Sequence, residues 1–278
     1  MTQYFFDFEN ENGFFCVFFF FLESYIYCTR NNLPLYIKDD KWKFLHSKGL
    51  DDYFLLNSNV IKKYNLLDNN LPTHRFGHMK TKKIKANLND YRKASHDLYR
   101  INPDILTDYN LPDEYNSIFI RGGDKLLYEA KHISIEKYID KLLSIDSLTK
   151  NLFVHSDDNL YVQQIKDYVL SKQLDIQIFS ITTPASNGGA VVMKRLNYGP
   201  CSHIKSIDDM DNNEVKNHTL LFLNAIEIMR KSKHVICSFD TNVSRFMKIN
   251  FTCKVISVNG NNNIPFHHFV KNPAYGFK

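Results

Sequence analysis

The second half of the sequence alternates short apolar runs with segments of helical periodicity, and this alternation limits the fold more than any other feature. Apolar runs predict strands at residues 117–120, 151–154, 176–181, 234–239 and 254–258. Helices are predicted between them, at residues 134–143, 159–171, 217–231 and 242–249. Strands that alternate with helices form parallel βαβ units, so we expect an α/β fold with a doubly wound parallel sheet.

The first half of the sequence gives a weaker pattern. It predicts a strand at residues 4–8, an apolar helix at 14–29, a strand at 35–37, and helices joined by polar loops over 51–110. The turn-forming segment Leu111-Pro112-Asp113-Glu114 separates the two patterns. We therefore predict two domains, 1–113 and 114–278, which is a natural division for 278 residues.

Composition excludes several classes of protein. The five cysteines are odd in number and contain no CxxC pair, which argues against a disulfide framework and a structural zinc site. A net charge of +5 is too small to indicate a nucleic-acid partner. The apolar run at residues 14–22 is far shorter than the ~20 residues of a membrane span, and the acidic residues before it do not resemble a signal peptide. We expect a cytoplasmic protein with no membrane span and no bound metal.

Polar residues follow three of the predicted strands. They form the segments Arg121-Gly122-Gly123-Asp124-Lys125, His155-Ser156-Asp157-Asp158 and Ser238-Phe239-Asp240-Thr241-Asn242. Parallel strands end at one edge of a sheet, and this edge is where such sheets bind ligands. Two cations, two glycines that permit close backbone approach, and nearby helix N-termini favour an anion, so the edge predicts a site for a phosphorylated ligand.

Each of these segments also has a purely structural interpretation. Arg121 can form an ion pair with Asp124 or Asp157. Asp157 and Asp158 can serve as an N-cap and a first-turn acid for the next helix, and Asp240 can cap the helix that follows it. The convergence of all three segments on one edge favours a ligand site over these interpretations taken singly.

The same residues resemble the motifs of one enzyme family. The stretch from Phe119 to Lys125 is similar to HVRRTDK of the α1,6-fucosyltransferases, a family with bacterial and viral members. Phe153-Val154-His155-Ser156-Asp157-Asp158 resembles its ATDD segment, and residues 237–245 resemble its CTFSSQVCR segment. Residues 115–258 carry the resemblance well. Asn12-Gly13 before the apolar helix gives a further, weaker similarity in the first half.

The resemblance implies a GT-B-like fold with two Rossmann-like domains, the donor-binding one in the C-terminal half. It implies a fucosyltransferase that moves fucose from GDP-fucose to a glycan acceptor, with inversion and without a metal or other cofactor. It also allows a location in the cytoplasm of a virus-infected host cell.

Carried over to this chain, Arg121 holds the β-phosphate of the donor, Glu129 is the base that deprotonates the acceptor, and Lys125 assists Glu129. The chemistry suits these roles, because inversion needs one carboxylate and a leaving diphosphate needs fixed cations when no metal is bound. The complete set of donor-binding residues expected here is Arg121, Gly122, Gly123, Asp124, Tyr138, Ser156, Asp157, Asp158, Asn224, Ser238, Asp240, Thr241 and Arg245.

Several positions differ from the family motifs and leave alternatives open. Gly122 stands where the motif has its second arginine, Phe119 where it has histidine, and Asp240-Thr241 where it has two serines. An expected aspartate on the helix before residue 234 falls at Ala225, next to Asn224. The alternatives are a transferase for another sugar nucleotide, and a catalytically degenerate protein that binds a nucleotide sugar or a glycan.

Overall fold

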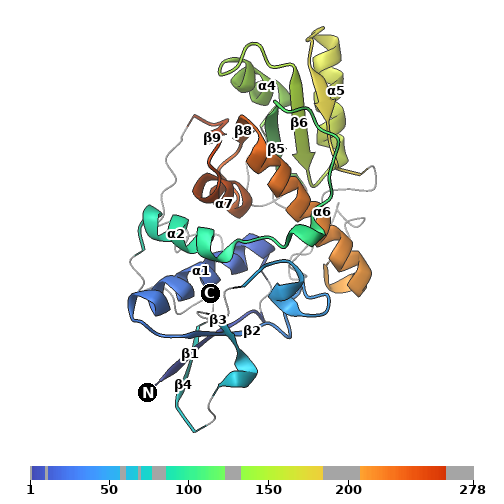
Figure 1. Cartoon of the computed structure of the whole chain (residues 1–278). Helices are drawn as coiled ribbons and strands as arrows, with labels where there is room; N and C mark the ends of the chain where they lie inside the picture. Colours follow the sequence, from blue (N-terminus) through green and yellow to red (C-terminus); the bar gives the residue numbers. More distant parts are fainter. Residues whose placement is uncertain are drawn as a thin grey trace, which may run out of the picture. The chain divides into compact units, whose positions relative to one another are not determined.

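The computed structural model describes residues 2–9, 12–56, 61–67, 70–76, 86–122, 133–183 and 207–260. They form two compact units. The first comprises Met1–Leu106 and Met210–Thr219, and the second comprises Thr107–Asp209 and Leu220–Pro265. Each unit contains a parallel β-sheet with helices (Figure 1). None of the described helices is long and apolar enough to cross a membrane.

The first unit is built on a sheet of four parallel strands in the order β3-β2-β1-β4. The strands are β1 (Gln3–Asp7), β2 (Leu35–Lys38), β3 (Ile61–Lys63) and β4 (Thr73–Phe76). The strands β3 and β4 correct our expectation of helices alone between residues 51 and 110. Both are short and rich in polar residues, so their sequences carry little of the apolar signal of a strand.

Two helices accompany this sheet, α1 (Phe14–Arg30) and α2 (Leu88–Leu98). The helix α1 begins after Gly13 and is buried along most of its length, which explains its run of phenylalanines. It carries one buried carboxylate, Glu23, to which the hydroxyl of Tyr91 on α2 donates a hydrogen bond of 2.7 Å. The predicted apolar helix is therefore the core helix of the first unit.

The second unit contains the doubly wound sheet that the sequence predicts. Its five parallel strands have the order β7-β6-β5-β8-β9. They are β5 (Asn116–Ile120), β6 (Asn151–Ser156), β7 (Gln177–Phe179), β8 (His234–Cys237) and β9 (Lys254–Ser257). The helices are α4 (Ile135–Leu143), α5 (Asn159–Ser171), α6 (Asn212–Lys231, from Leu220 onward within this unit) and α7 (Asn242–Asn250).

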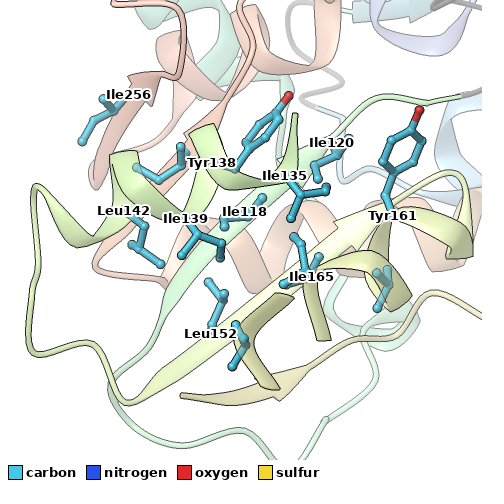
Figure 2. Close-up of a cluster of buried hydrophobic side chains, with 14 residues drawn as sticks. Ile118, Ile120, Ile135, Tyr138, Ile139, Leu142, Leu152, Tyr161, Ile165 and Ile256 are labelled. Atoms are coloured by element: carbon cyan, nitrogen blue, oxygen red, sulfur yellow. The ribbon is translucent and has the colours of Figure 1, made fainter. Parts of the chain in front are cut away.

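The core of the second unit forms because α4 and α5 each place one apolar face against the sheet. On α4 the buried residues are Ile135, Tyr138, Ile139 and Leu142, at the spacing of one helix face. They pack with Ile118 and Ile120 of β5, Leu152 of β6, and Tyr161 and Ile165 of α5 (Figure 2). This packing fixes the strand ends and helix starts that carry the polar residues.

Candidate functional site

Arg121 and Gly122 after β5 lie at one edge of the second sheet with the polar segments at the ends of β6 and β8. β5 is the central strand and pairs in parallel with both neighbours, with Ile120 opposite Ser156 and Phe119 opposite Cys237. The chain passes from β5 to β6 and β7 on one side, and then returns to β8 on the other side. The carboxyl ends of β5 and β8 therefore flank the point where the strand order reverses, which is where open α/β sheets bind ligands.

Arg121 directly follows β5, and its guanidinium forms an ion pair with the carboxylate of Asp157. Both side chains are largely buried, with exposed fractions of 19% and 14%. The other carboxylate oxygen of Asp157 accepts a hydrogen bond of 2.6 Å from the backbone N–H of Gly122. Asp157 thus contacts two consecutive residues at the end of β5, the side chain of Arg121 and the backbone of Gly122.

Gly122 lies in a space that has no room for a side chain. A Cβ atom at this position would lie 2.7 Å from Cε2 of Tyr161 and 3.2 Å from Cβ of Asp158. Contacts under 3.0 Å require the neighbouring atoms to move. A larger residue here would displace the side chains of the first turn of α5.

Asp158 and Ser156 stabilise the start of α5. Asp158 is the N-cap residue, and its side chain accepts a hydrogen bond of 2.9 Å from the backbone N–H of Leu160. The hydroxyl of Ser156 accepts one of 3.1 Å from the N–H of Asp158. The structure thus shows the capping role for Asp158, whereas Asp157 pairs with Arg121 instead of serving as a first-turn acid.

Tyr138 reaches the same edge from α4 and is 3% exposed. Burial raises the pKa of its hydroxyl, and the nearby groups of Cys237, Asp240 and Tyr161 raise it further. Its helix, α4, contacts both α5 and β8. Tyr138 is neutral at physiological pH and can donate a hydrogen bond.

The segment after β8 is held by its own side chains. The hydroxyl of Ser238 donates a hydrogen bond of 2.6 Å to the exposed carboxylate of Asp240. Thr241, and not Asp240, is the N-cap of α7, because its hydroxyl accepts from the N–H of Ser244 at 3.2 Å. Arg245 on α7 donates from Nε to the carbonyl of Phe239 at 3.3 Å.

Asn224 lies on α6 and is 4% exposed. Its carbonyl oxygen accepts a hydrogen bond of 2.8 Å from the N–H of Thr107, and its amide donates one of 2.8 Å to the carbonyl of Leu220. These bonds join α6 to the segment that leads toward β5. A contact between Asn224 and a donor stays a prediction.

Four of the predicted site residues lie outside the described residues. They are Gly123, Asp124, Lys125 and Glu129. Their roles stay predictions from the sequence.

The described part of the edge combines a paired cation with polar donors. Arg121 supplies the guanidinium, while Asp157 and Asp158 are engaged with Arg121 and with the start of α5. The helices α5 and α7 both begin at this edge, which adds partial positive charge from their first N–H groups. Within the described ranges, no group of three or more His, Cys, Asp or Glu side chains is arranged to hold a metal ion.

Sequence reasoning missed two residues of this edge, Tyr161 and Thr182. The hydroxyl of Thr182, which follows β7, donates to the carbonyl of Ser156 at 3.1 Å. The ring of Tyr161 fills the space beside Gly122. The only sequence signal for Tyr161 is its position three residues after the N-cap Asp158, which places it in the first turn of a helix that begins at the edge.

Comparison with solved structures finds the same fold in a bacterial α-1,6-fucosyltransferase. The structure of the fucosyltransferase NodZ from Bradyrhizobium is 10% identical, has a TM-score of 0.58, and is matched over 93% of this chain and 97% of that chain. A NodZ structure soaked with GDP-fucose is 9% identical, with a TM-score of 0.57 and coverage of 90% and 93%. A NodZ structure co-crystallised with GDP gives 9% identity, a TM-score of 0.54 and the same coverage.

No protein-family model and no curated protein matches the sequence. The structural likeness extends over nearly the full length of both chains, so it includes both compact units. The resemblance to the α1,6-fucosyltransferases predicted from the motifs is thereby confirmed at the level of the fold, a mixed α/β architecture with parallel sheets.

Proposed function

We propose that this chain is a glycosyltransferase that binds a nucleotide-sugar donor at the carboxyl edge of the second sheet. The observation that carries this proposal is the position of Arg121 at the strand-order reversal, in a fold shared with fucosyltransferases over about nine-tenths of both chains. A guanidinium suits the diphosphate of such a donor because its fork matches phosphate oxygens. NodZ structures were obtained with GDP and with GDP-fucose, which favours GDP-fucose as the donor here.

The proposed architecture is GT-B-like. In it the second unit, in the C-terminal half, binds the donor, and the first unit binds a glycan acceptor. The proposed reaction is an inverting transfer without a metal. The acceptor hydroxyl attacks the anomeric carbon of fucose, its proton passes to the carboxylate of Glu129, and the bond to the β-phosphate breaks with GDP as the leaving group. Arg121 stabilises the negative charge that develops on the leaving diphosphate.

The donor is tested by measuring the thermal unfolding of the protein with a panel of nucleotides. GDP and GDP-fucose are expected to raise the melting temperature, since a ligand that binds only the folded state stabilises it by mass action. UDP and UDP-sugars serve as matched controls for the base. Stabilisation by a UDP-sugar alone would identify another donor, and absence of any effect from every nucleotide would overturn the proposal.

The chemistry is tested by following the release of GDP from GDP-fucose with glycan acceptors and with water alone. We expect Glu129→Gln to lower turnover by about 10²–10⁴-fold while GDP binding is retained, because only the proton acceptor is removed. Arg121→Ala is expected to lose both binding and turnover. Unchanged turnover in Glu129→Gln would contradict the assigned base.

One observation favours a second candidate, a degenerate protein that binds the nucleotide sugar without transferring it. Gly122 stands where the motif has its second arginine, so Arg121 is the cation that remains. Arg121 in turn forms an ion pair with Asp157. A wild-type protein that binds GDP-fucose but releases no GDP with any acceptor or with water would support this candidate.

A further inference from the structure

Two buried tyrosines at the carboxyl edge end in hydroxyl groups that bind none of the described residues. Tyr138 on α4 is 3% exposed and Tyr161 on α5 is 9% exposed. The rings are buried, but neither hydroxyl oxygen is among the fully buried polar atoms that lack a partner, so both oxygens reach solvent. Figure 2 shows both rings near Ile120, at the end of β5, with their oxygens directed to the same side and away from the rest of the apolar cluster. Both hydroxyls are therefore accessible to a ligand that binds at this edge.

Tyr161 occupies the space in which a side chain of residue 122 would lie. Atoms Cε2 and Cδ2 of its ring are 2.7 Å and 3.1 Å from a Cβ built on Gly122. The fucosyltransferase motif has its second arginine at this position. An arginine there would require the ring of Tyr161 to move, so the ring position seen here goes together with glycine at residue 122.

The chemistry of this tyrosine is that of a neutral hydrogen-bond donor. Burial raises its pKa, and the negative charge of Asp158 raises it further. The hydroxyl therefore keeps its proton throughout the physiological range. Gly122 lies beside the ring of Tyr161 and directly follows Arg121, so the hydroxyl and the guanidinium belong to the same edge.

We propose that Tyr161, in the space that Gly122 leaves open, donates a hydrogen bond to the diphosphate of the nucleotide-sugar donor. Tyr161 would then contribute a neutral contact at the place where the motif has a second cation. The inference rests on the proposed function, and it assigns a donor-contacting residue that the motif does not contain. It also explains how a site with Gly122 retains more than one group for the diphosphate.

The test is calorimetric titration of GDP into the wild-type protein, Tyr161→Phe and Tyr168→Phe. Phenylalanine keeps the ring that packs against Gly122 and removes only the hydroxyl. A hydrogen bond to a charged oxygen contributes to binding free energy more than a neutral one does. We therefore expect GDP to bind Tyr161→Phe at least about tenfold more weakly than the wild type. Tyr168 lies on the same helix, and Tyr168→Phe is expected to match the wild type within about twofold.

The outcomes separate this inference from the proposed function. If the wild-type protein binds GDP and Tyr161→Phe binds it with equal affinity, the inference is overturned and the proposed function stands. Weaker binding of GDP-fucose but not of GDP would also overturn it, because the hydroxyl would then contact the sugar. Failure of the wild-type protein to bind GDP would overturn both. Circular dichroism of Tyr161→Phe checks that the variant is folded.

Discussion

The backbone N–H of Gly122 donates a hydrogen bond of 2.6 Å to the carboxylate of Asp157, and this bond joins the end of β5 to the end of β6. The same carboxylate pairs with Arg121. Two consecutive residues after β5 are therefore fixed by one side chain from the neighbouring strand. The carboxyl edge is held in place by groups of the protein itself, which is the condition for a preorganised anion site.

Replacement of Asp157 by asparagine is expected to destabilise the fold. Asparagine can still accept from the N–H of Gly122, but it removes the negative charge that Asp157 places against the largely buried guanidinium of Arg121. We expect the free energy of unfolding to fall by about 1–3 kcal/mol, less than for a fully buried pair because both groups have some solvent contact. Urea denaturation measures this change.

The matched control is Asp167→Asn on α5, which alters an exposed carboxylate that accepts a hydrogen bond from Gln163 on the same helix. It should change the free energy of unfolding by no more than a few tenths of a kcal/mol. Equal stability of Asp157→Asn and the wild type would contradict a structural role for the Arg121–Asp157 pair.

A second prediction concerns the space beside Gly122. Gly122→Ala places a methyl group against the ring of Tyr161 and should lower the free energy of unfolding by about 1–3 kcal/mol, the usual cost of overpacking. Gly13→Ala is the control, because no atom lies within 4 Å of a Cβ built at Gly13. Unfolding of both alanine variants at the same urea concentration would contradict the overpacking predicted at residue 122.

A third prediction separates capping from other roles of Thr241. Thr241→Ala removes the acceptor for the N–H of Ser244 and should destabilise the fold by about 1 kcal/mol. Thr241→Ser keeps the hydroxyl and should restore most of the loss. Chemical denaturation of the two variants tests the assignment, which fails if serine is no better than alanine.

A fourth prediction concerns pH. Burial lowers the pKa of His234 below its ordinary value of about 6.5, and the charge of Lys233 adds to this effect, while Asp146 opposes it. Nδ1 of His234 lies 2.9 Å from the side-chain oxygen of Asn116. As pH falls below about 6.5, the unfolded chain takes up a proton before the folded chain does, so stability is lost.

The free energy of unfolding should therefore decline between pH 7 and pH 5, and His234→Gln should show a smaller decline. His96→Gln is the control, because the side chain of His96 is 93% exposed. NMR titration of the His234 ring gives its pKa directly, and a value above 6.5 would reverse the predicted sign.

The sequence predicts the second sheet well because its central strands are buried on both faces. All five residues of β5 are buried, and such strands read as continuous apolar runs. The strands β3 and β4 escaped prediction for the opposite reason, since Thr73 and Arg75 of β4 are exposed. The strand β3 is stabilised by backbone pairing with β2, and β4 by pairing with β1. Such pairing between distant segments leaves no local pattern in the sequence.

The start of α6 carries a capping signal in the sequence that lies outside the predicted helix. The helix begins at Asn212 and not at residue 217. Asp211 accepts from the N–H of Glu214 at 2.9 Å, and Glu214 accepts from the N–H of Asp211 at 2.9 Å. This is a capping box, and the spacing Asp-x-x-Glu marks it in the sequence.

The candidate site was predictable as far as topology determines it. Parallel strands bring Arg121 and Asp157 to one edge, and their ion pair was one of the two pairings that the sequence allowed. The contact of Tyr161 with Gly122 was not predictable, because it depends on how the first turn of α5 packs over the end of β5. Spacing along the chain places residues on elements but does not fix such packing.

The central claim, that Arg121 at the carboxyl edge holds the diphosphate of the donor, is tested most directly by calorimetric titration of GDP. The wild-type protein and Lys150→Ala should bind GDP alike, since Lys150 precedes β6 at the opposite edge and pairs with the exposed Asp175. Arg121→Ala should bind at least tenfold more weakly, as expected for loss of a charge-assisted contact. Equal GDP affinity in Arg121→Ala and the wild type would contradict the claim.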